Sequence, residues 1–596
     1  MMRRKQRILS AVVLSLGLAT MALALELPKI DRKPVAARWQ RGKLTALPHY
    51  DPNSAKALSV DLRSYDLTGL NLQDRLEDLL HADFDDQTKW PAQMPQDYDY
   101  GQIMELGKNP GLGIRDLHRQ GITGQGVGIA ICDQPLLVDH QEYADRIRLY
   151  EEINILPGTK SQMHGPAVAS IAVGKTVGVA PEADLYYIAQ FNGMSLAGKP
   201  SWDFQPLARA IDRILEINQQ LPTERKIRVI SISVGWHPSQ RGYEQITEAV
   251  NKAKAAGMLV ICSSVEQVHG FRFHGLGRHP LADPNDFTAY GPGVWWARPF
   301  NEGHPSHAES NRLLVPMDAR TTASPTGVDE YVFYSEGGWS WSIPYIAGVY
   351  ALAAQVEPQI TPDRFWTLAM RTGRTIDLHR AGEERRFGPI LDAAALIAAL
   401  QRGELGDPEV VAAELAKYYP PGELQSRQAD APHVPKDVAA RIDKLAVGSA
   451  MRQDVIALFG EPLLYCQGKE RFDVSNLPSR FAMLYPGNVQ VIVSDDCVQS
   501  VVVTAPGYLL RGQIQVGASK EDVSKVLEPP LKTMEVASDF DIRKVTENPV
   551  FFQNAGGDAG SGYYRNEAEG VGLYFSQGKV MQICLLPRRP PAPITR

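Results

Sequence analysis

Short apolar runs alternate with longer amphipathic segments between residues 119 and 401 of this 596-residue chain. The first run, residues 127–132, is continuously apolar, which is typical of a parallel strand that helices cover on both faces. Residues 202–221 and 245–256 have the pattern of amphipathic helices, and strand-like runs follow them at 227–234 and 258–262. Strands that alternate with helices in this way predict an α/β fold with a doubly wound, mainly parallel sheet.

Three residues with reactive side chains stand at the ends of these predicted elements. Asp133 ends the first apolar run, and open α/β sheets carry their sites at the carboxyl ends of the strands. His164 begins a helix of small residues. Ser340 follows two glycines and begins an apolar helix, where Pro344 is expected in the first turn and unpaired N–H groups surround the hydroxyl. Each residue alone fits a strand-end carboxylate, a packed histidine or a helix-capping serine, whereas together they favour nucleophilic catalysis.

The order of these residues resembles that of the subtilisin-like serine peptidases. The shared motifs are the strand that ends at Asp133, His-Gly-x-x-Val-Ala from His164, Gly-Val-Ala-Pro at 178–181 and Gly-x-Ser-x-x-x-Pro around Ser340. The resemblance covers about residues 119–401 and implies a triad in which Ser340 is the nucleophile, His164 the base and Asp133 the group that orients the imidazole. It also implies a peptide or protein as substrate.

Two further residues, Ser233 and Gly235, match the segment that pairs with extended substrate in this family. A plain strand end is the alternative interpretation. Trp339 and Trp341 replace smaller residues beside the nucleophile and are expected to reshape the cleft.

The chain departs from the family at the oxyanion hole. The family places an asparagine after the strand that corresponds to residues 259–262, and this chain has none there. Glu266 occupies the slot by register and Gln267 follows it. A glutamine or a protonated glutamate could donate a hydrogen bond, whereas an ionised glutamate would repel the oxyanion. Because loss of one such donor costs about 3–4 kcal/mol, the expectation is a serine endopeptidase with weak or acid-shifted activity, or an impaired descendant that binds peptides or proteins.

The N-terminus predicts export. A basic start and an apolar stretch are typical of a signal peptide over residues 1–24, cleaved near Ala24, with an uncleaved membrane anchor as the alternative. The mature protein would be secreted or periplasmic, with no further membrane span. Residues 25–118 are expected to be a pro-segment or an N-terminal extension that wraps the next domain.

Composition excludes some classes of function. The net charge of −6 does not favour a nucleic-acid partner. The five cysteines form no metal motif and no disulfide scaffold, so no metal or other cofactor is expected. Cys132 and Cys262 are expected to be buried thiols, whereas Cys466 and Cys497 could pair.

A degenerate repeat follows a polar, proline-rich linker at residues 402–440. Its units, residues 441–510 and 511–586, each contain a short helix and then a hairpin, at 489–503 and 571–586. They resemble the small α+β modules of SmpA/BamE-like lipoproteins, which implies binding of an envelope protein. An α+β appendage, or an envelope scaffold in which this pair carries the function, is the alternative. The tail, residues 587–596, is expected to be disordered.

Overall fold

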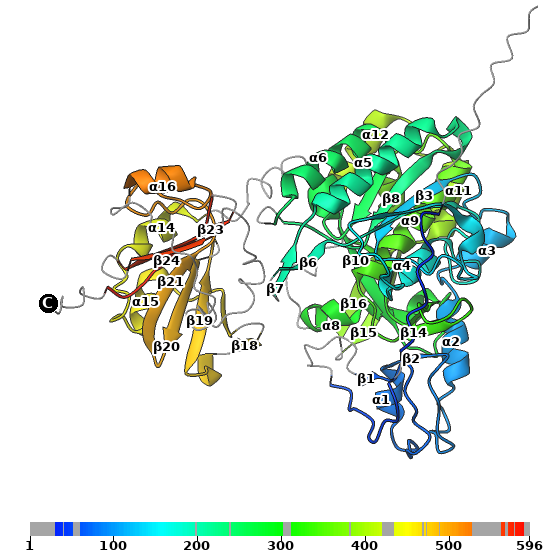
Figure 1. Ribbon diagram of the computed structural model, residues 1–596, viewed down its shortest axis with the longest axis horizontal. Helices are drawn as coiled ribbons and strands as arrows, with labels where there is room; N and C mark the ends of the chain where they lie inside the picture. Colours follow the sequence, from blue (N-terminus) through cyan, green and yellow to red (C-terminus); the bar gives the residue numbers. More distant parts are fainter. Residues whose placement is uncertain are drawn as a thin grey trace, which may run out of the picture.

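The computed structural model describes residues 30–588. The gaps in this range are 40, 52–59, 197–198, 238–239, 302–310, 381–382, 420–433, 468–469, 473, 488, 527–561, 567–569 and 577–578. The predicted signal peptide at 1–24 and residues 589–596 of the predicted tail lie outside the described residues. The rest forms one body before residue 420 and another after residue 433, each with its own hydrophobic core (Figure 1).

A five-stranded sheet at the centre of the first body confirms the predicted fold class. All of its neighbouring strands are parallel. In spatial order the strands are β4 (Ile147–Ile153), β5 (Asp184–Gln190), β3 (Gly128–Asp133), β8 (Ile227–Ile232) and β9 (Leu259–Cys262).

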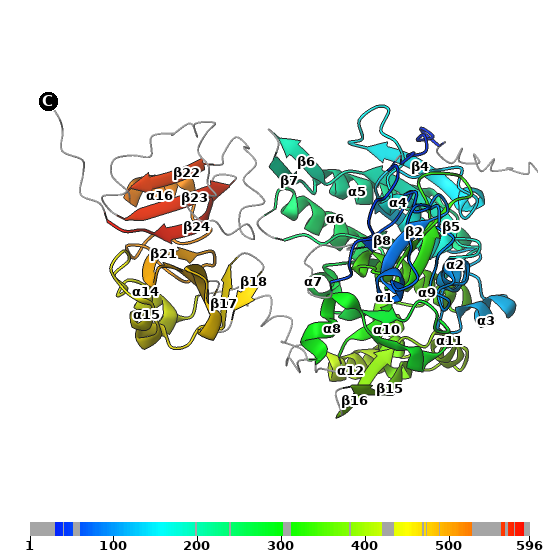
Figure 2. The same ribbon diagram turned by 90° about the horizontal axis from the view of Figure 1, so that it is seen from below.

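Helices cover both faces of this sheet (Figures 1 and 2). On β3, Ile129 and Ile131 pack with helices α4 (His164–Val173) and α9 (Trp339–Val356), whereas Ala130 and Cys132 pack with α5 (Gln205–Gln220) and α6 (Tyr243–Ala255). Alternate residues of one strand therefore enter two different cores, which explains why the strand is apolar throughout. Cys132 and Cys262 are buried free thiols, as predicted.

The first body also contains a second five-stranded sheet and several further helices. Its strands, in spatial order, are β11 (Tyr290–Pro292), β10 (Phe273–Arg278), β12 (Leu313–Pro316), β16 (Glu383–Ile390) and β15 (Arg374–Arg380). The hairpin β6 (Gly193–Leu196) and β7 (Lys199–Trp202) stands apart from both sheets. The remaining helices are α3 (Ile114–Arg119), α7 (Val265–His269), α8 (Val294–Asn301), α10 (Pro362–Thr372), α11 (Ala393–Gln401) and α12 (Pro408–Tyr418). Part of the predicted linker is thus helical, and the Tyr419 hydroxyl accepts a hydrogen bond from Trp366 at 3.0 Å.

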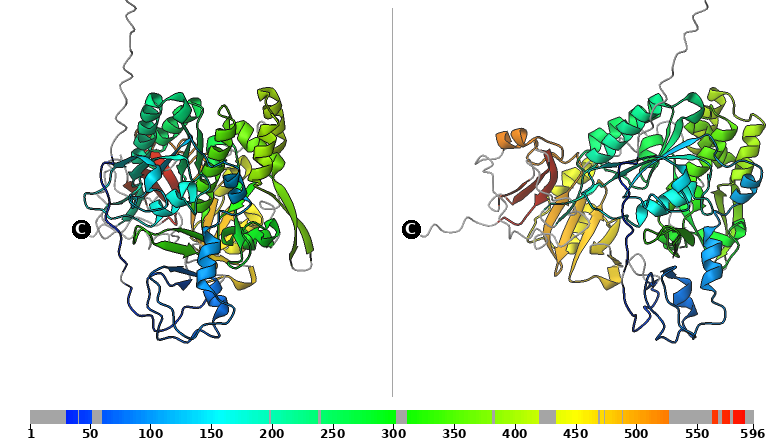
Figure 3. Two further views of the ribbon diagram at one scale, coloured as in Figure 1. Left: turned by 90° about the vertical axis from the view of Figure 1, so that its right-hand side faces the viewer. Right: turned by 45° about the vertical axis from the view of Figure 1, so that its right-hand side comes forward.

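The segment before residue 119 is built into the first body as a lobe beside its second half (Figures 1 and 3). It contributes β1 (Val60–Asp61), α1 (Leu76–Leu80), β2 (Ala82–Asp85) and α2 (Tyr100–Lys108). Strand β2 pairs with β14 (Tyr331–Tyr334), which pairs with β13 (Arg320–Ala323).

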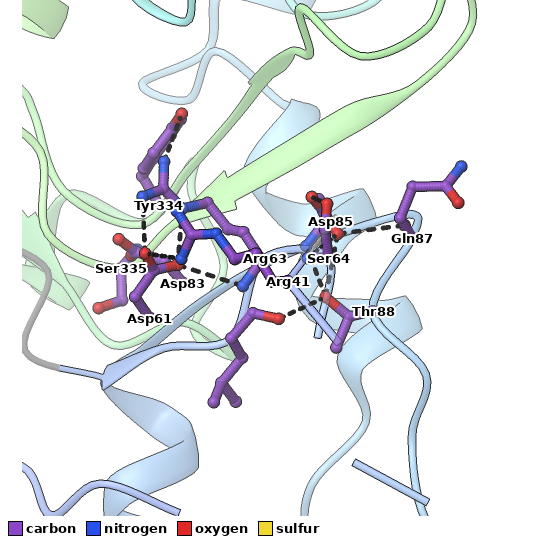
Figure 4. A network of polar contacts seen from close by, with 11 residues as sticks. Arg41, Asp61, Arg63, Ser64, Asp83, Asp85, Gln87, Thr88, Tyr334 and Ser335 are labelled. Carbon is purple, nitrogen blue, oxygen red and sulfur yellow. Dashed lines mark hydrogen bonds and ion pairs between the residues drawn. The ribbon is translucent and has the colours of Figure 1, made fainter. Parts of the chain in front are cut away.

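Buried polar contacts reinforce this pairing (Figure 4). The Arg63 side chain donates to Asp61 at 2.8 and 2.9 Å and reaches the hydroxyl of Tyr334 on β14 at 3.4 Å. Asp85 accepts from the hydroxyl of Ser64 at 2.6 Å. The part of the extension from residue 60 onward therefore packs on the domain through β2, and both predicted alternatives, a pro-segment and an N-terminal extension, stay predictions.

The second body contains one eight-stranded sheet that both predicted repeat units share. The strands, in spatial order, are β18 (Glu470–Phe472), β17 (Leu464–Gln467), β19 (Arg480–Tyr485), β20 (Val489–Ser494), β21 (Cys497–Val503), β24 (Lys579–Leu585), β23 (Val571–Ser576) and β22 (Gly562–Asn566). Helices α14 (Lys436–Ile442), α15 (Arg452–Phe459) and α16 (Lys520–Val526) pack on a common core with it. Cys466 and Cys497 lie on strands separated by two others, so no disulfide joins them, and none of the five cysteines is in a disulfide.

The two predicted hairpins have the same local structure. Both have an irregular register at the same point, next to Val493 in β20 and next to Phe575 in β23. Their second strands, β21 and β24, pair with each other, with Val502 opposite Cys584. The internal repeat is thus visible in the structure, whereas the likeness to SmpA/BamE-like modules stays a prediction.

Candidate active site

Asp133 and His164 lie in contact at the carboxyl end of the central strand. Asp133 is the last residue of β3, and His164 is the first residue of α4. The Nδ1 atom of His164 lies 2.7 Å from Oδ1 of Asp133, which also accepts the backbone N–H of Gln134 at 2.7 Å. A carboxylate at Nδ1 favours the tautomer with the proton on that nitrogen, which leaves Nε2 free to accept a proton.

The charge state of His164 reflects this contact. Burial alone would lower the pKa of His164, but the negative charge of Asp133 and the hydrogen bond to it raise the pKa above its usual value. Asp133 is therefore placed to stabilise the imidazolium that forms when His164 takes a proton.

Ser340 is the second residue of α9 and lies in its first turn, two residues after the extended Gly338. Backbone N–H groups in a first turn have no acceptor within the helix, so the N–H of Ser340 is available to an anion. The indole of Trp341 lies 5.4 Å from the imidazole of His164, measured between ring centroids. The start of α9 and the start of α4 therefore meet at this site.

Pro344 is not in the first turn, where the sequence had placed it. Helix α9 begins at Trp339, so Pro344 is its sixth residue and lies in the second turn. Because proline has no N–H, the carbonyl of Ser340 lacks its usual helical partner. The hydroxyl of Ser233 donates to that carbonyl at 3.1 Å instead.

Ser233 and Ser340 are joined in both directions. The hydroxyl of Ser340 donates to the backbone carbonyl of Ser233 at 3.3 Å. Ser233 directly follows β8, the neighbour of β3 in the sheet. The serine predicted to bind substrate thus holds the predicted nucleophile, and the Ser340 hydroxyl points to this carbonyl in the observed state.

Gly235 lies where two loops approach each other closely. A Cβ atom at this position would lie 2.6 Å from Oγ of Ser264, which accepts the backbone N–H of Trp236 at 3.0 Å. The loops after β8 and β9 can therefore pack only if this residue is a glycine.

Glu266, the residue that register places at the oxyanion position, contacts an arginine. Both Glu266 and Gln267 lie on the short helix α7, and Gln267 is exposed. Oε1 of Glu266 accepts from Nε of Arg272 at 2.9 Å, and the Arg272 side chain is 1% exposed. A buried arginine needs an acceptor of this kind, and a role of Glu266 in an oxyanion hole stays a prediction.

Several of these contacts have no local signal in the sequence. The pairs Ser233–Ser340 and Glu266–Arg272 join residues whose meeting depends on loop geometry.

Among the residues that the structure describes, no group of three or more histidine, cysteine, aspartate or glutamate side chains could hold a metal ion. No helix in the same set is long and apolar enough to cross a membrane.

Comparisons with known proteins agree with this architecture. Residues 124–295 match the model of the subtilase family, Peptidase_S8, a range that includes Asp133 and His164 and ends before Ser340. The subtilisin-like protease PopC of Myxococcus xanthus (strain DK1622) is 36% identical over 85 residues, which are 12% of this chain and 18% of that protein. Subtilisin-like protease 2 of Arthroderma otae is 25% identical over 243 residues, 40% of this chain and 52% of that protein.

Among solved structures, that of the prenylagaramide maturation protease PagA aligns with a TM-score of 0.35 at 17% identity, over 49% of this chain and 99% of that one. The sequence matches support a serine peptidase as the class of protein. More particularly, residues 124–295 are similar to the subtilase family. The matched segments span 18% and 52% of the length of the two relatives.

Proposed function

We propose that this protein is an exported serine endopeptidase that hydrolyses peptide bonds through Asp133, His164 and Ser340. The observation that carries the proposal is the 2.7 Å hydrogen bond between Asp133 and His164, next to Trp341 of the same helix turn that carries Ser340. The serine-peptidase class of the subtilase domain supports it.

In the proposed reaction, the Ser340 hydroxyl turns from the Ser233 carbonyl to Nε2 of His164. His164 takes the proton while Oγ attacks the peptide carbonyl, and then gives that proton to the leaving amine, which leaves an acyl-enzyme. A water molecule, which gives a proton to His164, then attacks the acyl carbon, and that proton returns to Oγ as the acid product leaves. The N–H of Ser340 donates to the developing oxyanion. Once the hydroxyl has turned away, the Ser233 carbonyl becomes free to accept an N–H of the substrate.

The second candidate is an impaired peptidase that binds peptides or proteins without turnover. The pairing of Glu266 with Arg272 favours it, because Glu266 accepts a hydrogen bond there and the chain has no asparagine amide at the predicted oxyanion position. Loss of one donor lowers the rate by about 10²–10³-fold, so turnover by the full triad would be slow.

A fluorophosphonate probe separates the two candidates, because it labels only an activated serine. We expect labelling of the wild-type protein and none of Ser340→Ala. Ser342→Ala is the matched control, since Ser342 lies on the same helix, is fully buried and donates to Pro316. Absence of labelling of folded protein between about pH 4 and 8, the range in which carboxylates and histidines titrate, would exclude the peptidase.

Export and partner binding are proposed from the sequence. If the signal peptide is cleaved near Ala24, N-terminal sequencing of the exported protein should begin at Leu25. An uncleaved anchor would instead leave the full mass on the membrane fraction. Residues 434–588 are proposed to bind an envelope protein.

A further inference from the structure

Four hydrogen bonds hold the backbone of residues 335–337, the segment that precedes the candidate nucleophile Ser340. The carboxylate of Asp83 accepts the N–H of Ser335 at 2.8 Å, and the Ser335 carbonyl accepts the N–H of Ala319 at 3.0 Å. Two residues on, the N–H of Gly337 donates to Asp318 at 2.8 Å, and its carbonyl accepts the indole N–H of Trp295 at 2.6 Å.

The groups that fix this backbone come from distant parts of the chain. Asp83 belongs to β2 of the N-terminal extension, and Figure 4 shows it next to Ser335. Asp318 follows β12, and its other oxygen accepts the N–H of Val294 at the start of α8, the helix that also carries Trp295. The segment 335–337 is thus held between the extension and α8.

Close packing leaves this segment little freedom. A Cβ atom on Gly337 would lie 2.1 Å from the carbonyl oxygen of Met317, so the backbone passes directly against its neighbour. Asp83 and Asp318 are both buried. Burial raises the pKa of Asp83, although the guanidinium of Arg63 and the N–H of Ser335 oppose the change.

We propose that Asp83, Asp318 and Trp295 are positioning residues for Ser340, and that the N-terminal extension is therefore a working part of the peptidase and not a removable pro-segment. The proposal rests on the function proposed above. Two residues separate the held segment from Ser340: Gly338, which is extended, and Trp339, which begins α9. A shift at Gly337 is therefore transmitted to the nucleophile. Small displacements of a reacting group lower the rate of a reaction steeply.

Trp295→Phe is the first test, because this indole is 59% exposed and its loss should not unfold the protein. Phenylalanine keeps an aromatic ring, although a smaller one, and has no N–H donor. We expect Ser340 in the folded variant to react with a fluorophosphonate about three- to tenfold more slowly at saturating probe, the effect of one lost hydrogen bond. The probe concentration for half-maximal rate should stay within about twofold, because a positioning residue acts on the reaction step. Trp202→Phe, at another exposed tryptophan, is the matched control.

Asp83 provides a second test with its own rescue. Asp83→Ala removes the acceptor for Ser335, and we expect labelling about tenfold slower. Asp83→Asn keeps an acceptor oxygen and resembles the neutral form that burial favours, so we expect it to restore the rate to within about twofold of wild type. Circular dichroism and the unfolding midpoint establish that each variant is folded at the assay temperature.

The outcomes separate this proposal from the function on which it rests. No labelling of wild-type protein, or labelling that persists in Ser340→Ala, contradicts the peptidase itself. Wild-type rates in both Trp295→Phe and Asp83→Ala overturn the positioning roles. An Asp83→Asn variant as slow as Asp83→Ala assigns the effect to the charge beside Arg63 and overturns the role of Asp83. Active, labelled protein whose N-terminus lies beyond residue 118 overturns the role of the extension.

Discussion

Pro344 determines how the candidate nucleophile is held. With any other residue at position 344, the backbone N–H of that residue would donate to the Ser340 carbonyl. The Ser233 hydroxyl would then compete for this acceptor. We expect Ser233→Ala to lower the free energy of unfolding by about 1 kcal/mol in the wild-type background. In a Pro344→Ala background the same change should cost less than about 0.5 kcal/mol, because the helix then supplies the donor.

Chemical denaturation of the four proteins in this cycle measures the coupling. Equal losses in both backgrounds would show that the carbonyl of Ser340 does not depend on Ser233.

The pKa of His164 gives a prediction about pH. His164 must be neutral to accept a proton, so a raised pKa moves the acid limb of Ser340 labelling above about pH 6.5, the ordinary value for histidine. Asp133→Asn removes the negative charge that raises the pKa and keeps only a neutral acceptor, so burial, which lowers the pKa, is less opposed. We therefore expect the pKa of His164 to fall in this variant.

NMR titration of ¹³C-labelled histidines follows the change, with His164→Ala to assign the signal. A pKa that does not change in Asp133→Asn would mean that the carboxylate does not control the charge of this imidazole.

Among the elements, α9 depends on a close approach to the loop after α4. A Cβ atom on Gly348 would lie 2.6 Å from Cβ of the buried Val179. We expect Gly348→Ala to destabilise the first body by about 1–3 kcal/mol through overpacking. Val179→Gly in the same chain removes that Cβ atom, so the double variant should lose less than the sum of the two single variants. Thermal unfolding of the single and double variants tests this, and additive losses would contradict it.

The sequence predicts the elements of the first body better than their contacts. Residues 127–132 and Asp133 are predictable because a strand buried on both faces is apolar throughout and ends visibly at a charge. The pair of Glu266 and Arg272 is not, because register along the chain does not show which way a side chain on a short helix points. Nor are Asp83 and Asp318 predictable as partners of residues 335–337, since only the tertiary fold brings them there.

At the scale of the whole molecule, the two bodies have separate hydrophobic cores. Because Asp133, His164 and Ser340 all belong to the first, we expect a chain that ends at residue 433 to react with a fluorophosphonate at the wild-type rate. A chain that ends at residue 510 should be less soluble than the chain that ends at residue 433. It would keep β21 but lose β24, the partner of β21 in the sheet, and so expose an open strand edge. Size-exclusion chromatography of both truncations provides the comparison. If the longer chain were the more soluble one, the first repeat unit would be complete without the second.

The pairing of β21 with β24 bears on how the second body arose. In the repeat these are equivalent strands, and Val502 and Cys584, which face each other, are equivalent positions within them. A single unit would carry this strand as an open edge, and the same antiparallel pairing between two chains would give a symmetric homodimer. Because both units lie in one chain, the second unit covers the edge that a second subunit would otherwise cover. Pairing at this edge therefore does not depend on protein concentration.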